Sequence, residues 1–271
     1  MKSWNESKRL VVKIGTSSLT YENGRFHLRR IEALVRTLSD FRNGGREVVL
    51  VSSGAITAGI ARLGLGHRPH SLEEKQAMAA VGQCELMRIY ENFFDLYGHP
   101  VGQVLLTGET IQREKARENA ESTFHTLLAL GCIPIVNEND TVSSEEIEAI
   151  ATFGDNDRLS AYVAILCHAD SLVILSDIDG LYDSDPHKNP EAKLIPTVER
   201  IDERILSYGG GAGSERGTGG VAAKLAAAQI ACREGITTYL VNGEDPTILY
   251  RLGDAERPGT VFLPYEDENK N

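Results

Sequence analysis

Short apolar runs alternate with longer amphipathic stretches along most of this chain. The apolar runs are rich in β-branched residues and end at polar or glycine-containing turns. Strands that are apolar on both faces are typical of a parallel sheet covered by helices on both sides. Six runs have this character, at residues 10–12, 48–51, 101–106, 133–136, 172–175 and 238–241.

The amphipathic stretches between these runs have helical periodicity. The clearest one contains Leu28, Ile31, Leu34, Leu38 and Phe41, and the helix is expected to stop at the Asn-Gly-Gly that follows. Further helices are predicted over residues 55–63, 72–97, 116–130, 156–167 and 220–233. The alternation predicts an α/β protein, a three-layer α/β/α sandwich with a mainly parallel central sheet. We expect one domain over residues 1–271, with a soft boundary between two halves near residue 170.

Composition excludes several classes of function. The net charge of −11 and the pI near 5.2 argue against a nucleic-acid-binding surface, which needs a basic stripe. No apolar run approaches the ~20 residues of a membrane span, and the N-terminal segment has no apolar signal-peptide core. We therefore expect a cytoplasmic protein without nucleic-acid or membrane partners.

Cysteines and histidines give no sign of a metal centre. The four cysteines (Cys84, Cys132, Cys167 and Cys232) are far apart and are interpreted as buried, reduced thiols. The seven histidines are also scattered, with no H-E-x-x-H pattern and no Cys/His cluster. The sequence thus predicts no structural zinc site.

Two segments in the first quarter of the chain contain groups that can bind an anion. Lys13 ends an apolar run and is followed by Gly15-Thr16-Ser17, so its ammonium and the turn N–H groups can contact a phosphate. A solvated lysine at a strand end is the alternative. Ser52-Ser53-Gly54-Ala55 opens a predicted helix with small residues, which leaves backbone N–H groups free for an anion. A nucleophilic Ser53 is disfavoured, because the G-x-S-x-G pattern is absent.

A third segment gathers carboxylates and carboxamides. Asn137-Glu138-Asn139-Asp140 follows an apolar run, and 153–157 (Phe-Gly-Asp-Asn-Asp) precedes a predicted helix. Such groups suit a cation, an ammonium group or the orientation of lysines. Helix capping by Asp155 or Asn156 is the alternative, and it explains one residue only. Residues 141–153, between the two motifs, are expected to form a hairpin flap.

The fourth segment is glycine-rich. Residues 217–224, Gly-Thr-Gly-Gly-Val-Ala-Ala-Lys, open an alanine-rich helix and happen to match G-x-G-x-x-A. That dinucleotide fingerprint should directly follow a strand, and here a glycine/serine loop precedes it, so we reject the dinucleotide interpretation. No P-loop motif is present either.

The four segments, in this order and spacing, resemble the amino acid kinase family. The resemblance runs from about residue 10 to 262 and is most specific at Ser53-Gly54-Ala55-Ile56, at 137–140 and at 154–157. Relatives that act on acetylglutamate or aspartate usually have a second glycine where this chain has Thr16. The resemblance is therefore to the glutamate-phosphorylating branch, in its form without the C-terminal RNA-binding-type (PUA) domain.

This resemblance implies a function. The expected reaction is ATP-dependent phosphorylation of the side-chain carboxylate of L-glutamate to L-glutamyl 5-phosphate, the first step of proline biosynthesis. The resemblance also implies Mg²⁺ on the ATP phosphates, feedback inhibition by proline and a homo-oligomer. The amino-acid half would be about 1–170 and the nucleotide half about 171–265. The alternatives are another family kinase, such as acetylglutamate kinase, or a non-catalytic sensor of nucleotide or amino acid.

The resemblance also implies roles for individual residues. Lys13 would contact the transferred phosphoryl group, Lys224 the ATP phosphates, and Asp157 would position both lysines. The glutamate-binding positions would be Ser53, Asp140 and Asn156. The nucleotide-binding positions would be Lys13, Ser176, Asp177, Thr218, Gly219, Gly220, Val221, Ala222, Ala223 and Lys224. Ser176 stands where many relatives have threonine, and Val221-Ala222-Ala223 replaces a hydroxyl-bearing triplet, so backbone contacts to phosphate must suffice there.

Overall fold

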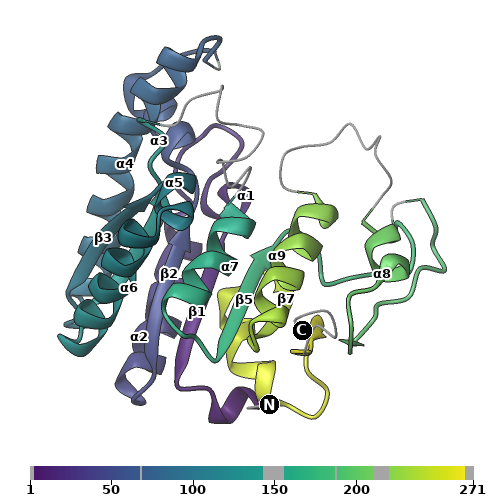
Figure 1. Ribbon diagram of the computed structural model, residues 1–271. Coiled ribbons are helices and arrows are strands. Elements are labelled where there is room, and N and C mark those ends of the chain that lie inside the picture. Colours follow the sequence, from purple (N-terminus) through teal and green to yellow (C-terminus); the bar gives the residue numbers. More distant parts are fainter. Residues whose placement is uncertain (1–2, 68, 143–155, 187, 210–219, 266–271) are drawn as a thin grey trace.

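The computed structural model describes residues 3–67, 69–142, 156–186, 188–209 and 220–265 (Figure 1). Within these ranges one eight-stranded sheet has the order β3-β4-β2-β1-β5-β7-β8-β6. The strands are β1 (Arg9–Ile14), β2 (Glu47–Ser52), β3 (Val101–Leu106), β4 (Ile133–Glu138), β5 (Ser171–Ser176), β6 (Thr197–Val198), β7 (Thr237–Asn242) and β8 (Thr260–Phe262).

The sheet is mainly parallel, as predicted. β1 pairs in parallel with β2 on one side and with β5 on the other, so a single sheet continues across the region around residue 170. The antiparallel pairing is that of β7 with β8.

Helices cover both faces of this sheet. The α-helices are α1 (Thr16–Leu19), α2 (Leu28–Asn43), α3 (Ala55–Leu63), α4 (Leu72–Asp95), α5 (Gly108–Gln112), α6 (Glu114–Ala129), α7 (Asn156–Leu166), α8 (Glu203–Ser207) and α9 (Val221–Arg233); Trp4–Glu6 and Pro246–Gly253 are 3₁₀ helices. No helix in the described ranges is long and apolar enough to cross a membrane.

Side-chain alternation along the strands separates two cores. Leu10, Val12 and Ile14 of β1 pack with α2 and α4, whereas Val11 packs on the opposite face with α7 and α9. Figure 1 shows α6, α7 and α9 beside one another over the strands. Because strand residues alternate in direction, Lys13 lies on the same face as Val11. The three-layer α/β/α sandwich is therefore confirmed.

The strands and helices predicted from periodicity are all present, with ends shifted by up to a few residues. Five short elements are not predicted by the sequence pattern: β6, β8, α1, α5 and α8. These contain two to five residues each, too few to establish a period. The prediction that the cysteines are buried was wrong for Cys84, which is exposed on α4, and holds for Cys167 and Cys232.

Close contact between α3 and α4 fixes the start of α3. A Cβ atom on Gly82 of α4 would lie 1.7 Å from the carbonyl oxygen of Ala55, and one on Gly59 of α3 would lie 2.0 Å from that of Met78. Only glycine permits backbones to approach this closely. The first turn of α3, which follows Ser53, is therefore held in a defined position against α4.

Gly82→Ala should destabilise the protein, because a rigid backbone carbonyl occupies the space of the added methyl group. Overpacking of this kind costs about 1–3 kcal/mol. Urea unfolding followed by circular dichroism measures the loss. Gly66→Ala is the matched control, since a Cβ there meets nothing within 4 Å. Equal midpoints for the two variants would contradict the interpretation.

Candidate active site

The candidate site lies where four neighbouring parallel strands end. In the order β4-β2-β1-β5, these strands bring Asn137, Ser53, Lys13 and Ser176 to one edge of the sheet. Register confirms the alignment, with Ile14 opposite Ser52 on one side and Leu175 on the other. In open α/β sheets, ligands bind in the crevice outside the carboxyl ends of the strands.

A buried charge cluster occupies the middle of this edge. Lys13 Nζ lies 2.5 Å from Asp157 Oδ1, and Lys224 Nζ lies 3.2 Å from Asp157 Oδ2. The three side chains come from β1, α7 and α9, and they are 9%, 1% and 7% exposed. Two ammonium groups share one carboxylate, so the cluster has an excess of one positive charge. A buried excess charge of this sign attracts an anion such as a phosphate.

A chain of hydrogen bonds adjoins the cluster. Asn156, the first residue of α7, donates from Nδ2 to Ser53 Oγ at 2.7 Å and to Asn137 Oδ1 at 3.0 Å. Asn137 in turn donates to Gln83 Oε1 of α4 at 2.9 Å. The Asn156 side chain thus connects the ends of β2 and β4, which helix capping alone does not explain.

The turn after β2 is held by a hydrogen bond in the core and by a glycine at the start of α3. The hydroxyls of Ser52 and Tyr90 lie 2.8 Å apart in the core, and burial raises the pKa of Tyr90. Gly54 has φ of +102°, a conformation that favours glycine, and it caps α3. The first N–H groups of α3 lack intrahelical partners and are available to an anion beside Ser53.

Two cavities meet at this edge. The larger has a volume of about 970 Å³, and its walls include Thr16, Ser53, the first turn of α3, Asn137, Asp140 and Asn156. The smaller has a volume of about 250 Å³ and is lined by Lys13, Gly15, Thr16, Ser17, Ser53, Asn156, Asp157, Leu175, Ser176, Asp177 and Lys224. Thr16, Ser53 and Asn156 belong to both walls, so ligands in the two cavities would be neighbours.

Asp140 is the predicted site residue with a clearly shifted acidity. Burial raises the pKa of its carboxyl group from the ordinary 3.8 to about 6. Desolvation disfavours the charged form of a carboxyl group, and a bound cation reverses that effect. A raised pKa in a cavity wall is typical of a functional carboxylate.

Other predicted positions fall nearby or outside the described residues. Ser176 and Asp177 line the smaller cavity. Gly220, Val221, Ala222 and Ala223 form the N-terminal turn of α9, immediately before Lys224. Thr218 and Gly219, and the flap predicted at 141–153 from residue 143 onward, lie outside the described residues.

Further residues at the site are not predicted by any motif in the sequence. Gln83 is buried and fixes Asn137, while Glu22, His67 and Lys75 line the larger cavity. None of these lies in a recognisable motif. Helical spacing assigns Gln83 to the buried face of α4 but gives no indication that it meets β4.

A family model matches this chain over most of its length. The model of the amino acid kinase family matches residues 8–242, most of the chain. The chain belongs to the amino acid kinase family.

Curated family members are close in sequence. A glutamate 5-kinase of Clostridium perfringens is 54% identical over 267 residues, covering 98% of this chain and 99% of the relative. A glutamate 5-kinase of Listeria innocua is 49% identical, with coverages of 98% and 97%.

Solved structures agree on the fold at much lower identity. A UMP kinase from Bacillus anthracis superposes with a TM-score of 0.63 at 18% identity, covering 95% of this chain and 96% of that one. An isopentenyl phosphate kinase from T. acidophilum gives a TM-score of 0.60 at 17% identity, with coverages of 94% and 99%. The α/β/α sandwich is thus common to this chain and to kinases of unlike substrates.

Proposed function

We propose that this chain is an ATP-dependent kinase that phosphorylates the side-chain carboxylate of L-glutamate, giving L-glutamyl 5-phosphate, the product that opens proline biosynthesis. The observation that supports this most is the pair of adjoining cavities, one with the Lys13–Asp157–Lys224 cluster and one with Asp140. Full-length similarity to curated glutamate 5-kinases supports the choice of substrate.

In this proposal the larger cavity takes glutamate and the smaller takes the ATP phosphates. A side-chain carboxylate oxygen attacks the γ-phosphorus in line, the bond from that phosphorus to the β–γ bridging oxygen breaks, and ADP leaves. The attacking carboxylate is already ionised at neutral pH, so no general base is needed. The obstacle is the approach of two anions, and Lys13 and Lys224 lower it by neutralising charge.

Each site residue then has a defined task. Lys13 contacts the transferred phosphoryl group, Lys224 the ATP phosphates, and Asp157 keeps both ammonium groups in place. Ser53 and Asn156, in the wall between the cavities, orient the glutamate.

The smaller cavity fits a nucleotide that brings its own Mg²⁺. The polar groups described there include two ammonium groups, which cannot bind a metal ion, hydroxyls, and the carboxylate of Asp177, while Asp157 is already engaged by both lysines. Mg²⁺ retains much of its water and is bound largely through substrate phosphates in kinases. We expect it on the ATP phosphates, where it would neutralise charge.

An ADP-release assay with a panel of acidic amino acids tests the proposal. L-Glutamate should support ADP release, and hydroxylamine should trap the acyl phosphate as a hydroxamate. N-Acetylglutamate and aspartate are the comparison substrates. A clear preference for N-acetylglutamate would overturn the choice of substrate, and no ADP release with any of them would favour a non-catalytic sensor.

Asp140 should bind the α-ammonium group of glutamate. Asp140→Asn should raise KM for glutamate about ten- to a hundredfold, because a charge-assisted hydrogen bond contributes about 1.5–3 kcal/mol, while KM for ATP changes little. In the wild type, kcat/KM for glutamate should fall about tenfold per pH unit below the Asp140 pKa of about 6, as the carboxylate becomes protonated.

The raised pKa of Asp140 also predicts the thermal stability of the Asp140→Asn variant. The folded pKa lies above the ordinary value, so the ionised Asp140 is unfavourable to the folded state above about pH 6. Asp140→Asn should therefore melt no lower than the wild type at pH 7.5. An unchanged KM, or a profile that stays flat down to pH 5, would remove Asp140 from the ammonium site.

Proline should inhibit by competing with glutamate. It carries an α-carboxylate and a secondary ammonium group, so Asp140 and the N–H groups beside Ser53 can bind it, yet it offers no side-chain nucleophile. Initial rates should show a higher apparent KM for glutamate, with the full rate restored by saturating glutamate. Inhibition that glutamate does not relieve would place proline elsewhere.

A further inference from the structure

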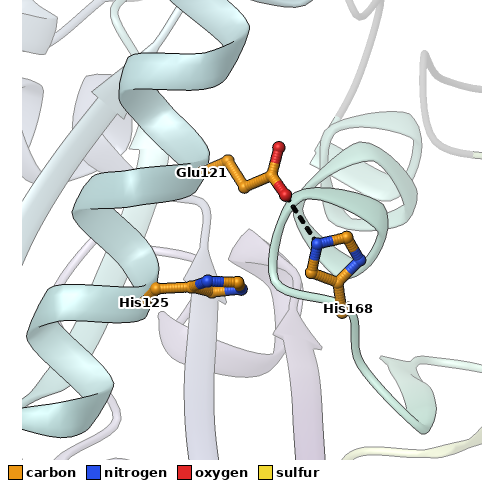
Figure 2. A group of neighbouring side chains, drawn as sticks. All are labelled: Glu121, His125 and His168. Atoms are coloured by element: carbon orange, nitrogen blue, oxygen red, sulfur yellow. Dashed lines mark hydrogen bonds and ion pairs between the residues drawn. The ribbon is translucent and has the colours of Figure 1, made fainter.

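A second cluster of metal-binding side chains lies between α6 and the end of α7 (Figure 2). Glu121 and His125 are four residues apart on α6, so they project from the same face of the helix. His168 lies two residues beyond the end of α7 and approaches from the other side, with Nε2 at 2.6 Å from Glu121 Oε1.

The backbone of His168 presents its ring to α6. With φ of +48° it is the non-glycine residue with positive φ in the described chain, and it ends α7 through a hydrogen bond from its N–H to the carbonyl of Ile165. Glycine or asparagine is usual at such a helix end. Here the position holds an imidazole, whose ring centre lies 5.2 Å from that of His125.

The geometry is close to that of a three-ligand metal site. One ligand atom from each of the three side chains lies within 4.8 Å of the others. Around a tetrahedral zinc ion, ligand atoms at ~2.0–2.1 Å from the metal are about 3.3 Å apart. Reaching that spacing needs only small side-chain rotations, which are available because the side chains of His168 and Glu121 are 62% and 37% exposed.

We propose that Glu121, His125 and His168 bind one divalent transition-metal ion of the Zn²⁺ or Ni²⁺ class, which links α6 to the end of α7. Two imidazoles and a carboxylate are the donors such ions prefer, whereas Mg²⁺ prefers oxygen ligands. Water completes the coordination, since the site faces solvent.

The site is separate from the candidate active site. Asn156 and Asp157 lie at the first turn of α7 and His168 lies beyond its last, and eleven helical residues span about 16 Å. The bound ion therefore takes no part in phosphoryl transfer. Its effect is to fasten two neighbouring helices, and a ligand that binds only the folded state raises the melting temperature.

Titration calorimetry with Zn²⁺ tests the proposal on chelator-treated protein in a Cys84→Ser background, which removes the exposed thiol as a competing ligand. We expect one Zn²⁺ per chain, binding of Ni²⁺ at the same stoichiometry and no competition from Mg²⁺. Zn²⁺ should also raise the melting temperature.

Substitution of each proposed ligand tests whether the ion binds at this cluster. His125→Ala and His168→Asn should each weaken Zn²⁺ binding at least tenfold and abolish the thermal shift, because even groups outside the ligand set contribute ten- to a hundredfold. Asparagine is chosen at position 168 because it tolerates positive φ, so the fold is kept. Glu121→Gln should weaken binding in the same direction.

His70→Gln is the matched control. It removes an exposed histidine from another pair, in which the rings of His67 and His70 stack with centres 5.2 Å apart. Zn²⁺ affinity should equal that of the parent. Absence of one-to-one binding, binding that survives both His125→Ala and His168→Asn, or binding lost in His70→Gln would each overturn the proposal.

Discussion

Lys13→Ala and Lys224→Ala should each lower kcat by about 10²–10³-fold, the loss typical of removing one charge-stabilising group from a transition state. Either change takes the cluster with Asp157 from an excess of one positive charge to neutrality. The charge is needed most when two anions approach, so kcat should fall more than KM for ATP rises.

Steady-state kinetics with glutamate and ATP measure this effect, and thermal melts show that each variant is folded. Lys115→Ala is the control, because Lys115 is an exposed lysine paired with Glu118 on α6 and its loss should leave kcat unchanged. A near-normal kcat in either variant would remove that lysine from the catalytic group.

Asp157→Asn should have the largest effect on stability. The substitution leaves the ammonium groups of Lys13 and Lys224 buried without their shared carboxylate, and breaking a buried ion pair from one side costs about 3–5 kcal/mol. The free energy of unfolding in urea measures the loss, and kcat should fall as well because the lysines lose their fixed positions.

A second substitution tests whether the loss of stability in Asp157→Asn comes from the unbalanced charges of the two buried lysines. Adding Lys13→Met to Asp157→Asn removes one of the two buried like charges, so part of the stability should return while activity stays absent. Glu118→Gln is the surface control and should cost less than about 0.5 kcal/mol. An Asp157→Asn variant as stable as the wild type would show that the cluster does not depend on this carboxylate.

Local patterns predicted the architecture and the region of the site. Apolar runs in β1, β2, β4 and β5 are long enough to be recognised as buried parallel strands, and polar residues stand at or just after the end of each strand. Parallel strands end at one edge of a sheet, and the structure places Lys13, Ser53 and Asn137 at that edge. This much follows from the period and order of residues along the chain.

Other features depend on contacts between residues far apart in sequence. The pairing of Gln83 with Asn137 spans 54 positions and that of Lys224 with Asp157 spans 67. Alternation along β1 shows that its residues point to two faces, but it does not show which helices cover each face. Only the packing of the layers places α7 and α9 on the face of Val11 and Lys13.

The succession of strands and helices and the polar residues at the strand ends therefore follow from local patterns along the chain. The packing of the layers placed Gln83 against Asn137, paired β8 antiparallel with β7 and brought His168 to α6, whereas the place of Asp157 beside both lysines was implied by the family resemblance. The physical reason is that periodicity reports which side of an element is buried, whereas the packing of whole layers selects what it is buried against.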